Sequence, residues 1–276
     1  MKPNEIKTNL KAGRPVFGIM LSAIHGGRWT QMLASTTLDY VVIDWEHGFR
    51  SRDEIAAVVN AAKSAGLTAI VRVPDVDPVF VAMARDAAAD GVLVPYCEDL
   101  DMVRACVSKL RLHPLKGEWF YKASTKGQFP SEKTQKYLEN RNKDLLFVLG
   151  VESKPAVDKI EDLLNCGEID GVFVGPNDMT TSLGIPDEVS NELYIRTVED
   201  LVSVCDARGI PMMVHHQTME TSLKVLEIGA RFVLHSSDAN ILRNAINSEM
   251  EQLRKAAVEK WGTVSDVRVE DRMDVV

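Results

Sequence analysis

Short apolar runs recur along the chain and alternate with longer segments of helical spacing. Each run is rich in the β-branched and aromatic residues that favour buried strands. The runs cover residues 16–21, 40–43, 68–73, 91–96, 145–151, 171–174, 211–214 and 231–234. Eight strands alternating with helices predict an α/β protein built as one (β/α)8 barrel, a TIM barrel. The main alternative is a doubly wound open sheet, but the chain has neither G-x-G-x-x-G after the first run nor a G-x-x-x-x-G-K-[ST] phosphate loop.

The spacing indicates a single domain over residues 1–260 and a charged tail over 261–276. One segment, 112–143, interrupts the pattern and is expected to be a long loop. It holds four aromatic residues, Trp119, Phe120, Tyr121 and Phe129. An excursion of this length that carries aromatic side chains is typical of a functional lid or an oligomer contact.

Composition narrows the class of protein. The chain has 276 residues and a net charge of -8, without a Lys/Arg stripe, which argues against a nucleic-acid binder. No apolar run approaches the roughly 20 residues that span a bilayer, and the first residues lack the apolar core of a signal peptide. The four cysteines form no C-x-x-C pair. We therefore expect reduced thiols in a cytoplasmic protein that has no membrane or nucleic-acid partner.

Titratable residues gather where the predicted strands end. The stretch 40–47, YVVIDWEH, passes from an apolar strand to Asp44, Glu46 and His47 within four positions. A polar turn is the plain interpretation of one such stretch, but polar side chains follow other strands too. These are Arg72, Glu152, Asn177, Asp178, His215, His216 and His235. Because a barrel places its active site at the carboxyl ends of its strands, we expect these residues to share one mouth.

Two of these residues, Glu152 and Asp178, are carboxylates on neighbouring predicted strands. Left unpaired they would repel, and one would hold a proton. Mg²⁺ or Mn²⁺ commonly binds one or two carboxylates and completes its shell with water and substrate oxygens. The alternative is that each carboxylate pairs with a nearby Arg or Lys. Backbone amides freed by Gly175-Pro176 could hold a substrate carboxylate beside the metal.

Arg72 and His47 suggest the chemistry of this mouth. Arg72 could neutralise the acidic cluster, or it could hold the oxygen of a carbonyl that becomes an enolate. His47 can act as a base near neutral pH. The predicted strand ends carry no Lys for a Schiff base, which favours a metal-stabilised enolate over an imine. His215, His216 and His235 are expected to form pocket wall.

Five motifs together resemble one known family. They are the D-x-E-H of residues 44–47, the strand ending at Arg72, Asp77-Pro78 followed by Asp86, Val151-Glu152, and the V-G-P-N-D of residues 174–178. In this combination, over about residues 14–255, the chain resembles the metal-dependent class II pyruvate aldolases of the HpcH/HpaI type. The resemblance implies a barrel of the phosphoenolpyruvate/pyruvate-binding type, often with an exchanged last helix, assembled as a trimer of dimers (a hexamer).

The resemblance also implies roles for individual residues. His47 matches the catalytic base, Asp86 the carboxylate that raises its basicity, and Arg72 the residue that stabilises the enolate. Glu152 and Asp178 match the ligands of Mg²⁺ or Mn²⁺, with Co²⁺ as a further option. The amides around Gly175 and Asn177 match the site of the donor carboxylate. The expected set is completed by Asp44 as a catalytic residue and by Pro176 and Trp45 as substrate-binding residues.

The chain departs from the family pattern at two places. Family members commonly carry Gln where this chain has Gly150, and many carry an Arg-Gly pair where residues 114–120 read PLKGEWF. With Trp45 inside the D-x-E-H motif, these departures favour a larger and more apolar acceptor pocket.

The resulting hypothesis is a divalent-metal-dependent carbon–carbon lyase. It would cleave or form a 4-hydroxy-2-oxo acid from a small-molecule 2-oxo acid and an aldehyde, through a pyruvate enolate. The alternatives are an oxaloacetate decarboxylase or a synthase that uses the enolate, then an acyl-CoA lyase, and from another class an inactive barrel that binds a 2-oxo acid.

Overall fold

Eight parallel strands close into a barrel in the computed structural model, which describes residues 1–25, 27–48 and 50–265. Each strand pairs with the next, and β1 pairs with β8. The strands are β1 Val16–Leu21, β2 Tyr40–Asp44, β3 Thr68–Arg72, β4 Gly91–Val94, β5 Leu146–Gly150, β6 Gly171–Val174, β7 Met212–His216 and β8 Phe232–Ser237. The predicted (β/α)8 barrel is confirmed, and all eight apolar runs contain a strand.

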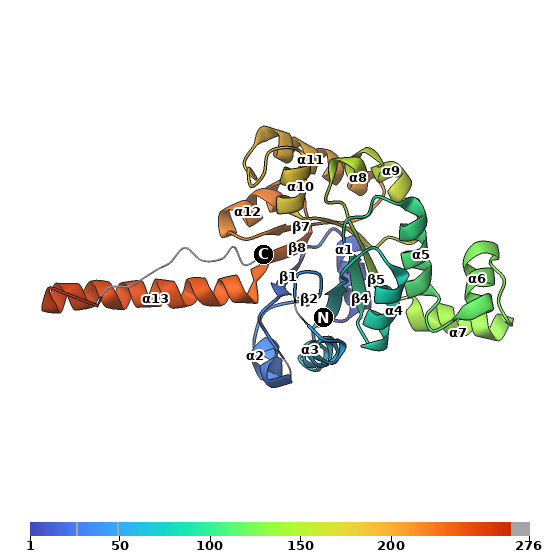
Figure 1. The fold of residues 1–276 in the computed structure, drawn as a ribbon, viewed down its shortest axis with the longest axis horizontal. Coiled ribbons are helices and arrows are strands. Elements are labelled where there is room, and N and C mark those ends of the chain that lie inside the picture. Colours follow the sequence, from blue (N-terminus) through green and yellow to red (C-terminus); the bar gives the residue numbers. More distant parts are fainter. Residues whose placement is uncertain (26, 49, 266–276) are drawn as a thin grey trace.

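Helices cover the outside of the barrel, except the first, whose Ile6 and Leu10 belong to the cluster inside the barrel, and the last, which projects away from it (Figure 1). They are α1 Pro3–Lys11, the 3-10 turn η1 Gly27–Trp29, α2 Thr30–Ala34, α3 Arg52–Ser64, α4 Pro78–Asp86, α5 Leu100–Arg111, α6 Gly117–Lys126, α7 Glu132–Asn142, α8 Lys154–Asp158, α9 Ile160–Leu163, α10 Pro176–Ser182, α11 Glu192–Ala207, α12 Met219–Ile228 and α13 Asp238–Trp261. Local sequence sets many of their ends. Ser51 caps α3 by accepting a hydrogen bond from the Glu54 amide at 3.2 Å, and the Glu54 carboxylate accepts one from the Ser51 amide at 2.7 Å.

The alternation of side chains along each strand divides the apolar core into two layers. Inside the barrel lie residues such as Val42, Ile70, Phe173, Met213 and Leu234. The residues between them face outward and pack under the helices, in a second and larger cluster. An inward residue near the carboxyl end of a strand therefore faces the mouth of the barrel.

The segment 112–143 is not a loop, because most of it forms α6 and α7. It connects α5 to β5, so it reaches β5 at the amino end of that strand, which is opposite the mouth. Figure 1 shows α6 and α7 beyond α5 at the rim of the molecule. The aromatic rings meet cations there: Lys109 Nζ lies 4.3 Å from the centre of the Phe120 ring, and Lys122 Nζ lies 4.8 Å from that of Trp119. These aromatics therefore do not line the mouth of their own barrel.

The last helix, α13, projects away from the barrel (Figure 1). It has 24 residues and leaves large apolar side chains in solvent along its length. These are Ile241, Leu242, Ile246, Met250, Leu253, Val258 and Trp261. Of the charged tail expected over 261–276, residues 266–276 lie outside the described part of the chain. No helix within that part is long and apolar enough to cross a membrane.

Candidate active site

The barrel brings Asp44 and Arg72 together at its mouth. They are partners in the register of β2 and β3, one layer above Val42 and Ile70. Arg72 donates from Nε to Asp44 Oδ1 at 2.9 Å, and its Nη2 lies 2.8 Å from Asp44 Oδ2. Both side chains are buried. Burial alone would raise the pKa of Asp44, but the guanidinium outweighs it and lowers that pKa below its usual value.

Asp44 also orders the chain that follows it. Its Oδ1 accepts hydrogen bonds from the backbone amides of Glu46 at 3.1 Å and His47 at 3.4 Å. The carboxylate thus holds Arg72 and shapes the turn that carries the next two titratable side chains. The compact D-x-E-H spacing has this physical basis.

Glu46 is a carboxylate that the surrounding groups only partly neutralise. Its Oε2 lies 3.1 Å from Arg72 Nη1, but this ion pair lacks hydrogen-bond alignment, so the buried oxygen has no hydrogen-bond partner. Burial raises the pKa of Glu46 to about 7, and Asp44 and Asp178 add to the rise while Arg72 opposes it. Glu46 therefore marks an excess of negative charge at the mouth.

His47 is the most exposed member of this group, with 38% of its side chain accessible. Its Nε2 lies 3.6 Å from Glu46 Oε2. Burial and the charge of Arg72 lower the pKa of His47 below its usual value, although Asp44 and Asp178 oppose the shift. The imidazole is therefore neutral near pH 7 and can accept a proton.

Glu152 lies deeper, and it is almost fully buried. Its Oε2 accepts a hydrogen bond from the Tyr96 amide at 2.8 Å. Burial raises its pKa to about 8, with a further contribution from Glu46. Two glycines make room for this carboxylate: a Cβ at Gly175 would lie 2.5 Å from Glu152 Oε1, and one at Gly150 would lie 2.9 Å from Oε2.

Asp178 belongs to the same group. It lies in the first turn of α10, which begins directly after β6, and Gly175 is the capping residue of that helix. Its charge acts on Glu46, His47 and Glu152. The structure thus brings Asp44, Glu46, His47, Arg72, Glu152 and Asp178 to one mouth.

A family model for the HpcH/HpaI aldolase/citrate lyase domain matches residues 27–245 of the chain. The chain belongs to the HpcH/HpaI aldolase/citrate lyase family. A relative from Citrobacter koseri, 5-keto-4-deoxy-D-glucarate aldolase, is 26% identical over 256 residues, which are 92% of this chain and 97% of the relative. The chain is accordingly an enzyme of the aldolase and lyase class.

Solved structures agree with this assignment. A family protein from Burkholderia cenocepacia matches with a TM-score of 0.77 at 25% identity, covering 91% of this chain and 99% of that one. The citrate lyase beta subunit of M. tuberculosis, complexed with oxaloacetate and magnesium, matches with a TM-score of 0.54 at 15% identity, covering 84% and 96%. At that identity the second likeness concerns the fold alone.

In this family member, Glu152 and Asp178 are suited to hold a divalent cation. Asp44, Glu46, Glu152 and Asp178 share the mouth with the buried guanidinium of Arg72. One Glu46 oxygen has no hydrogen-bond partner, and burial, with a contribution from Glu46, raises the pKa of Glu152 to about 8. The described residues contain no group of three or more His, Cys, Asp or Glu that could hold a metal. A two-carboxylate site completed by water and substrate oxygens is the kind that Mg²⁺ uses.

Two expected site residues lie elsewhere. Trp45 donates from its indole nitrogen to the Arg50 carbonyl oxygen at 3.0 Å and packs edge-on against Phe80, so its side chain turns outward toward the helices. Asp86 ends α4, about 12 Å along the helix axis from the first residue of that helix. Its carboxylate meets His113 Nε2 at 3.0 Å. The structure thus brings neither Trp45 nor Asp86 to His47.

Gly150 does not enlarge the mouth. A Cβ there would lie 2.6 Å from the Val94 carbonyl oxygen and 2.8 Å from Pro95 Cα. The backbone after β4 thus occupies the space that a longer side chain would need. The expected gain in pocket volume from this glycine is therefore wrong.

Tyr96 is a site residue that sequence reasoning missed. It follows β4, adopts a positive φ of 49°, and aims its amide at Glu152. Burial raises the pKa of its phenol, and Asp178 and Glu152 contribute, so the ring lies near the carboxylates. The signal in the sequence was its position at the end of the apolar run 91–96.

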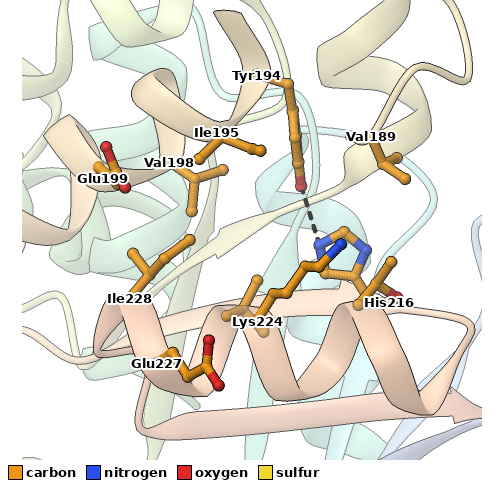
Figure 2. A pocket seen from close by; sticks show the side chains of 11 residues that line it. Val189, Tyr194, Ile195, Val198, Glu199, His216, Lys224, Glu227 and Ile228 are labelled. Atoms are coloured by element: carbon orange, nitrogen blue, oxygen red, sulfur yellow. Dashed lines mark hydrogen bonds between the residues drawn. The ribbon is translucent and has the colours of Figure 1, made fainter. Parts of the chain in front are cut away.

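The three histidines of the last strands do not share a face. His215 points inward, where its Nε2 meets the Ser236 carbonyl oxygen at 3.1 Å. His235 pairs instead with Ser222 of α12. His216 faces outward and meets the Tyr194 hydroxyl at 3.3 Å, beside a cavity of about 360 Å³ between α11 and α12 (Figure 2). Only His215 remains a candidate for the wall of the mouth.

Proposed function

We propose that this enzyme is a divalent-metal-dependent aldolase that cleaves or forms a 4-hydroxy-2-oxo acid through a pyruvate enolate. The observation that carries the proposal is the meeting of a neutral His47, Arg72 and an excess of carboxylates at one mouth. Glu152 and Asp178 would hold Mg²⁺ or Mn²⁺, with Co²⁺ as a further option. When bound, the cation would act as a Lewis acid toward the 2-oxo group.

Arg72 keeps donors free for the substrate. A guanidinium has five N–H groups. Two of them serve Asp44 and one points toward Glu46, which leaves two for the oxygen that becomes negative in the enolate. Asp44 positions the guanidinium for this role. Backbone N–H groups around Gly175 and Asn177, at the start of α10, would receive the donor carboxylate beside Pro176, which has no N–H of its own.

His47 would move the proton. In the cleavage direction it takes the proton of the 4-hydroxyl group while the C3–C4 bond breaks. The aldehyde leaves, and the bonding electron pair passes into the enolate of pyruvate. His47 then returns its proton to C3 of the enolate, which yields pyruvate and restores the neutral imidazole. The role expected for Asp86, to raise the basicity of His47, is not met within one chain, where its half-exposed carboxylate meets His113 instead.

The aldolase ranks above the decarboxylase and the synthase for a structural reason. Those alternatives drew support from the aromatic segment and from Gly150. The aromatic segment lies at the end of the barrel opposite the mouth. Neighbouring backbone occupies the space that a side chain at position 150 would need. Neither feature supports an altered mouth.

Assembly and location are parts of the proposal. The apolar side chains that α13 exposes support a homo-oligomer, with the family's trimer of dimers as the expected form. The four cysteines are buried and free, in keeping with a cytoplasmic enzyme.

The test is hydrogen exchange at the pyruvate methyl group in D2O, followed by NMR. It needs no knowledge of the aldehyde. We expect exchange that depends on Mg²⁺ or Mn²⁺ and is lost in His47→Ala. The control is His216→Ala, which removes a histidine that faces away from the mouth. Absence of exchange with any metal, together with turnover of oxaloacetate, would contradict the aldolase and favour the decarboxylase.

A further inference from the structure

Neutral polar side chains line the part of the mouth formed by β7, β8 and the start of α13. Met213 of β7 and Leu234 of β8 lie inside the barrel. Because side chains alternate along a strand, His215 lies one layer above Met213 on the same inner side. Arg72 and Asp44 are the charged groups of the mouth that act on His215. This imidazole therefore borders the site described above.

Hydrogen bonding decides which nitrogen of His215 carries the proton. Nε2 lies 3.1 Å from the Ser236 carbonyl oxygen, which can only accept, and 3.5 Å from the Gln217 amide nitrogen. The shorter contact makes Nε2 a donor to Ser236. Nδ1 is then left as an acceptor. The residue is only 9% exposed, and burial lowers its pKa to about 4, so the ring is uncharged near pH 7.

The neighbours of His215 form an ordered network. Gln217 Oε1 accepts from Asn240 Nδ2 at 2.7 Å and from Ser236 Oγ at 3.5 Å. Asn240 Oδ1 in turn accepts from Arg243 Nη2 at 2.7 Å. These bonds use the Gln217 carbonyl oxygen, while its amide nitrogen lies 3.5 Å from His215 Nε2. The charged groups in the first turns of α13 are Arg243, behind Asn240, and Asp238, whose carboxylate accepts hydrogen bonds from the backbone amides of residues 22–24.

The mouth is therefore divided by charge. Arg72 and the acidic side chains described above follow β2, β3, β5 and β6, whereas the β7–β8 wall offers the uncharged His215 acceptor. Asp238, which follows β8, is bound by the backbone amides of residues 22–24. If the charged side holds the 2-oxo acid, as the proposed function requires, the second reactant lies against the neutral wall. An aldehyde without a polar group would leave His215 Nδ1 unpaired, and a carboxylate cannot donate to it.

We propose that His215 is a specificity-determining residue, whose Nδ1 accepts a hydrogen bond from a hydroxyl group on the aldehyde half of the substrate. The inference rests on the proposed function and adds the class of aldehyde, a hydroxyaldehyde. Gln217 is a positioning residue beside it.

The experiment compares glycolaldehyde with acetaldehyde, each with pyruvate and Mg²⁺ or Mn²⁺. Sites built to bind a hydroxyl group reject analogues that lack it, so we expect kcat/KM to favour glycolaldehyde by at least about 100-fold. His215→Leu removes the acceptor and should lower this ratio at least about tenfold. His215→Gln keeps both an amide donor and an acceptor and should restore part of it. His216→Leu, the outward-facing neighbour, should retain the ratio of the unaltered enzyme.

Two results would overturn the assignment. One is the same aldehyde ratio in His215→Leu as in the unaltered enzyme. The other is an NMR spectrum of ¹⁵N-labelled protein in which His215 carries its proton on Nδ1 at pH 7. Pyruvate methyl exchange without aldehyde separates the possible failures. If the unaltered enzyme exchanges the methyl hydrogens but His215→Leu leaves the aldehyde ratio unchanged, only the role of His215 is overturned. If the unaltered enzyme does not exchange them, the proposed function and this inference are overturned together.

Discussion

Arg72 binds Asp44 through two parallel contacts, Nε to Oδ1 at 2.9 Å and Nη2 to Oδ2 at 2.8 Å. The two residues are partners in the register of β2 and β3. The fork geometry of a guanidinium suits this arrangement, and the point charge of a lysine does not. The pair orients Arg72 while leaving two of its donors for substrate. The enolate-stabilising role proposed for Arg72 therefore depends on Asp44.

Arg72→Lys tests this dependence. Lysine keeps the charge but loses the two-point contact and the free donors, so we expect pyruvate methyl exchange to fall about 10²- to 10³-fold. NMR in D2O measures the rate at saturating metal. The control is Arg196→Lys, on the exposed face of α11, which should exchange at the original rate. Near-original exchange in Arg72→Lys would show that charge alone suffices.

The raised pKa of Glu152 predicts how the stability of the metal-free enzyme depends on pH. The pKa is about 8 in the folded protein and about 4.3 in an unfolded chain. Between these values the folded state binds more protons, so the free energy of unfolding decreases as the pH rises toward about 8. Glu46, with a pKa of about 7, acts in the same direction. Buried histidines act oppositely, but only below about pH 6.5.

Urea unfolding of EDTA-treated enzyme between pH 6.5 and 8.5 measures this slope. We expect Glu152→Gln to reduce it, because glutamine does not titrate. Saturating Mn²⁺ should stabilise the original protein more at pH 8 than at pH 6.5, since a cation binds the deprotonated carboxylate. A slope that Glu152→Gln leaves unchanged would place the titrating group elsewhere.

Glu152→Ala tests the metal site directly. Removing one of two carboxylate ligands should abolish EDTA-sensitive pyruvate exchange and weaken Mn²⁺ binding, as measured by calorimetry. Glu161→Ala, on the outer helix α9, is the matched control and should bind Mn²⁺ normally. Full exchange by Glu152→Ala that is insensitive to EDTA would exclude the proposed metal site.

Gly150→Ala tests the tight packing beneath Glu152. The added Cβ would lie 2.6 Å from the Val94 carbonyl oxygen, so the backbone of residues 94–96 must shift. We expect a loss of about 1–3 kcal/mol in stability, as for other overpacked sites, together with weaker Mn²⁺ binding. Gly171→Ala is milder, because its Cβ would meet the edge of the Phe232 ring at 3.2 Å. Equal losses in both variants would contradict a special role for Gly150.

The apolar face of α13 predicts self-association. Leu253 is 62% exposed in the single chain and belongs to the apolar side chains that we expect to be covered in the oligomer. Leu253→Glu places a charge among them. We expect light scattering to show an oligomer for the original chain and smaller species for this variant. Lys255→Glu, on the opposite face by helical spacing, should retain the oligomer. A monomeric original chain would refute the proposed assembly.

The sequence by itself determined the barrel and most of its mouth. Short apolar runs rich in β-branched and aromatic residues marked the strands, and polar residues at the ends of these runs marked the site, because parallel strands of a barrel all end at one face. This argument located Asp44, His47, Arg72, Glu152 and Asp178 without coordinates. The order of elements also implies that residues 112–143 enter β5 from the end opposite the mouth, but the expectation of a lid or an oligomer contact was drawn from their length and aromatic content instead.

Only the tertiary structure decided where individual side chains point once a strand has ended. Trp45 turns outward and His47 does not, because the turn after β2 follows the hydrogen bonds of Asp44 rather than a regular period. His215 and His216 look alike in sequence, yet one borders Arg72 and the other borders Tyr194. In the sequence Gly150 suggested a larger pocket, because family members commonly carry Gln there. In the structure the backbone of Val94 and Pro95 occupies that space. These outcomes depend on contacts between residues far apart in the chain, and local pattern carries no information about such contacts.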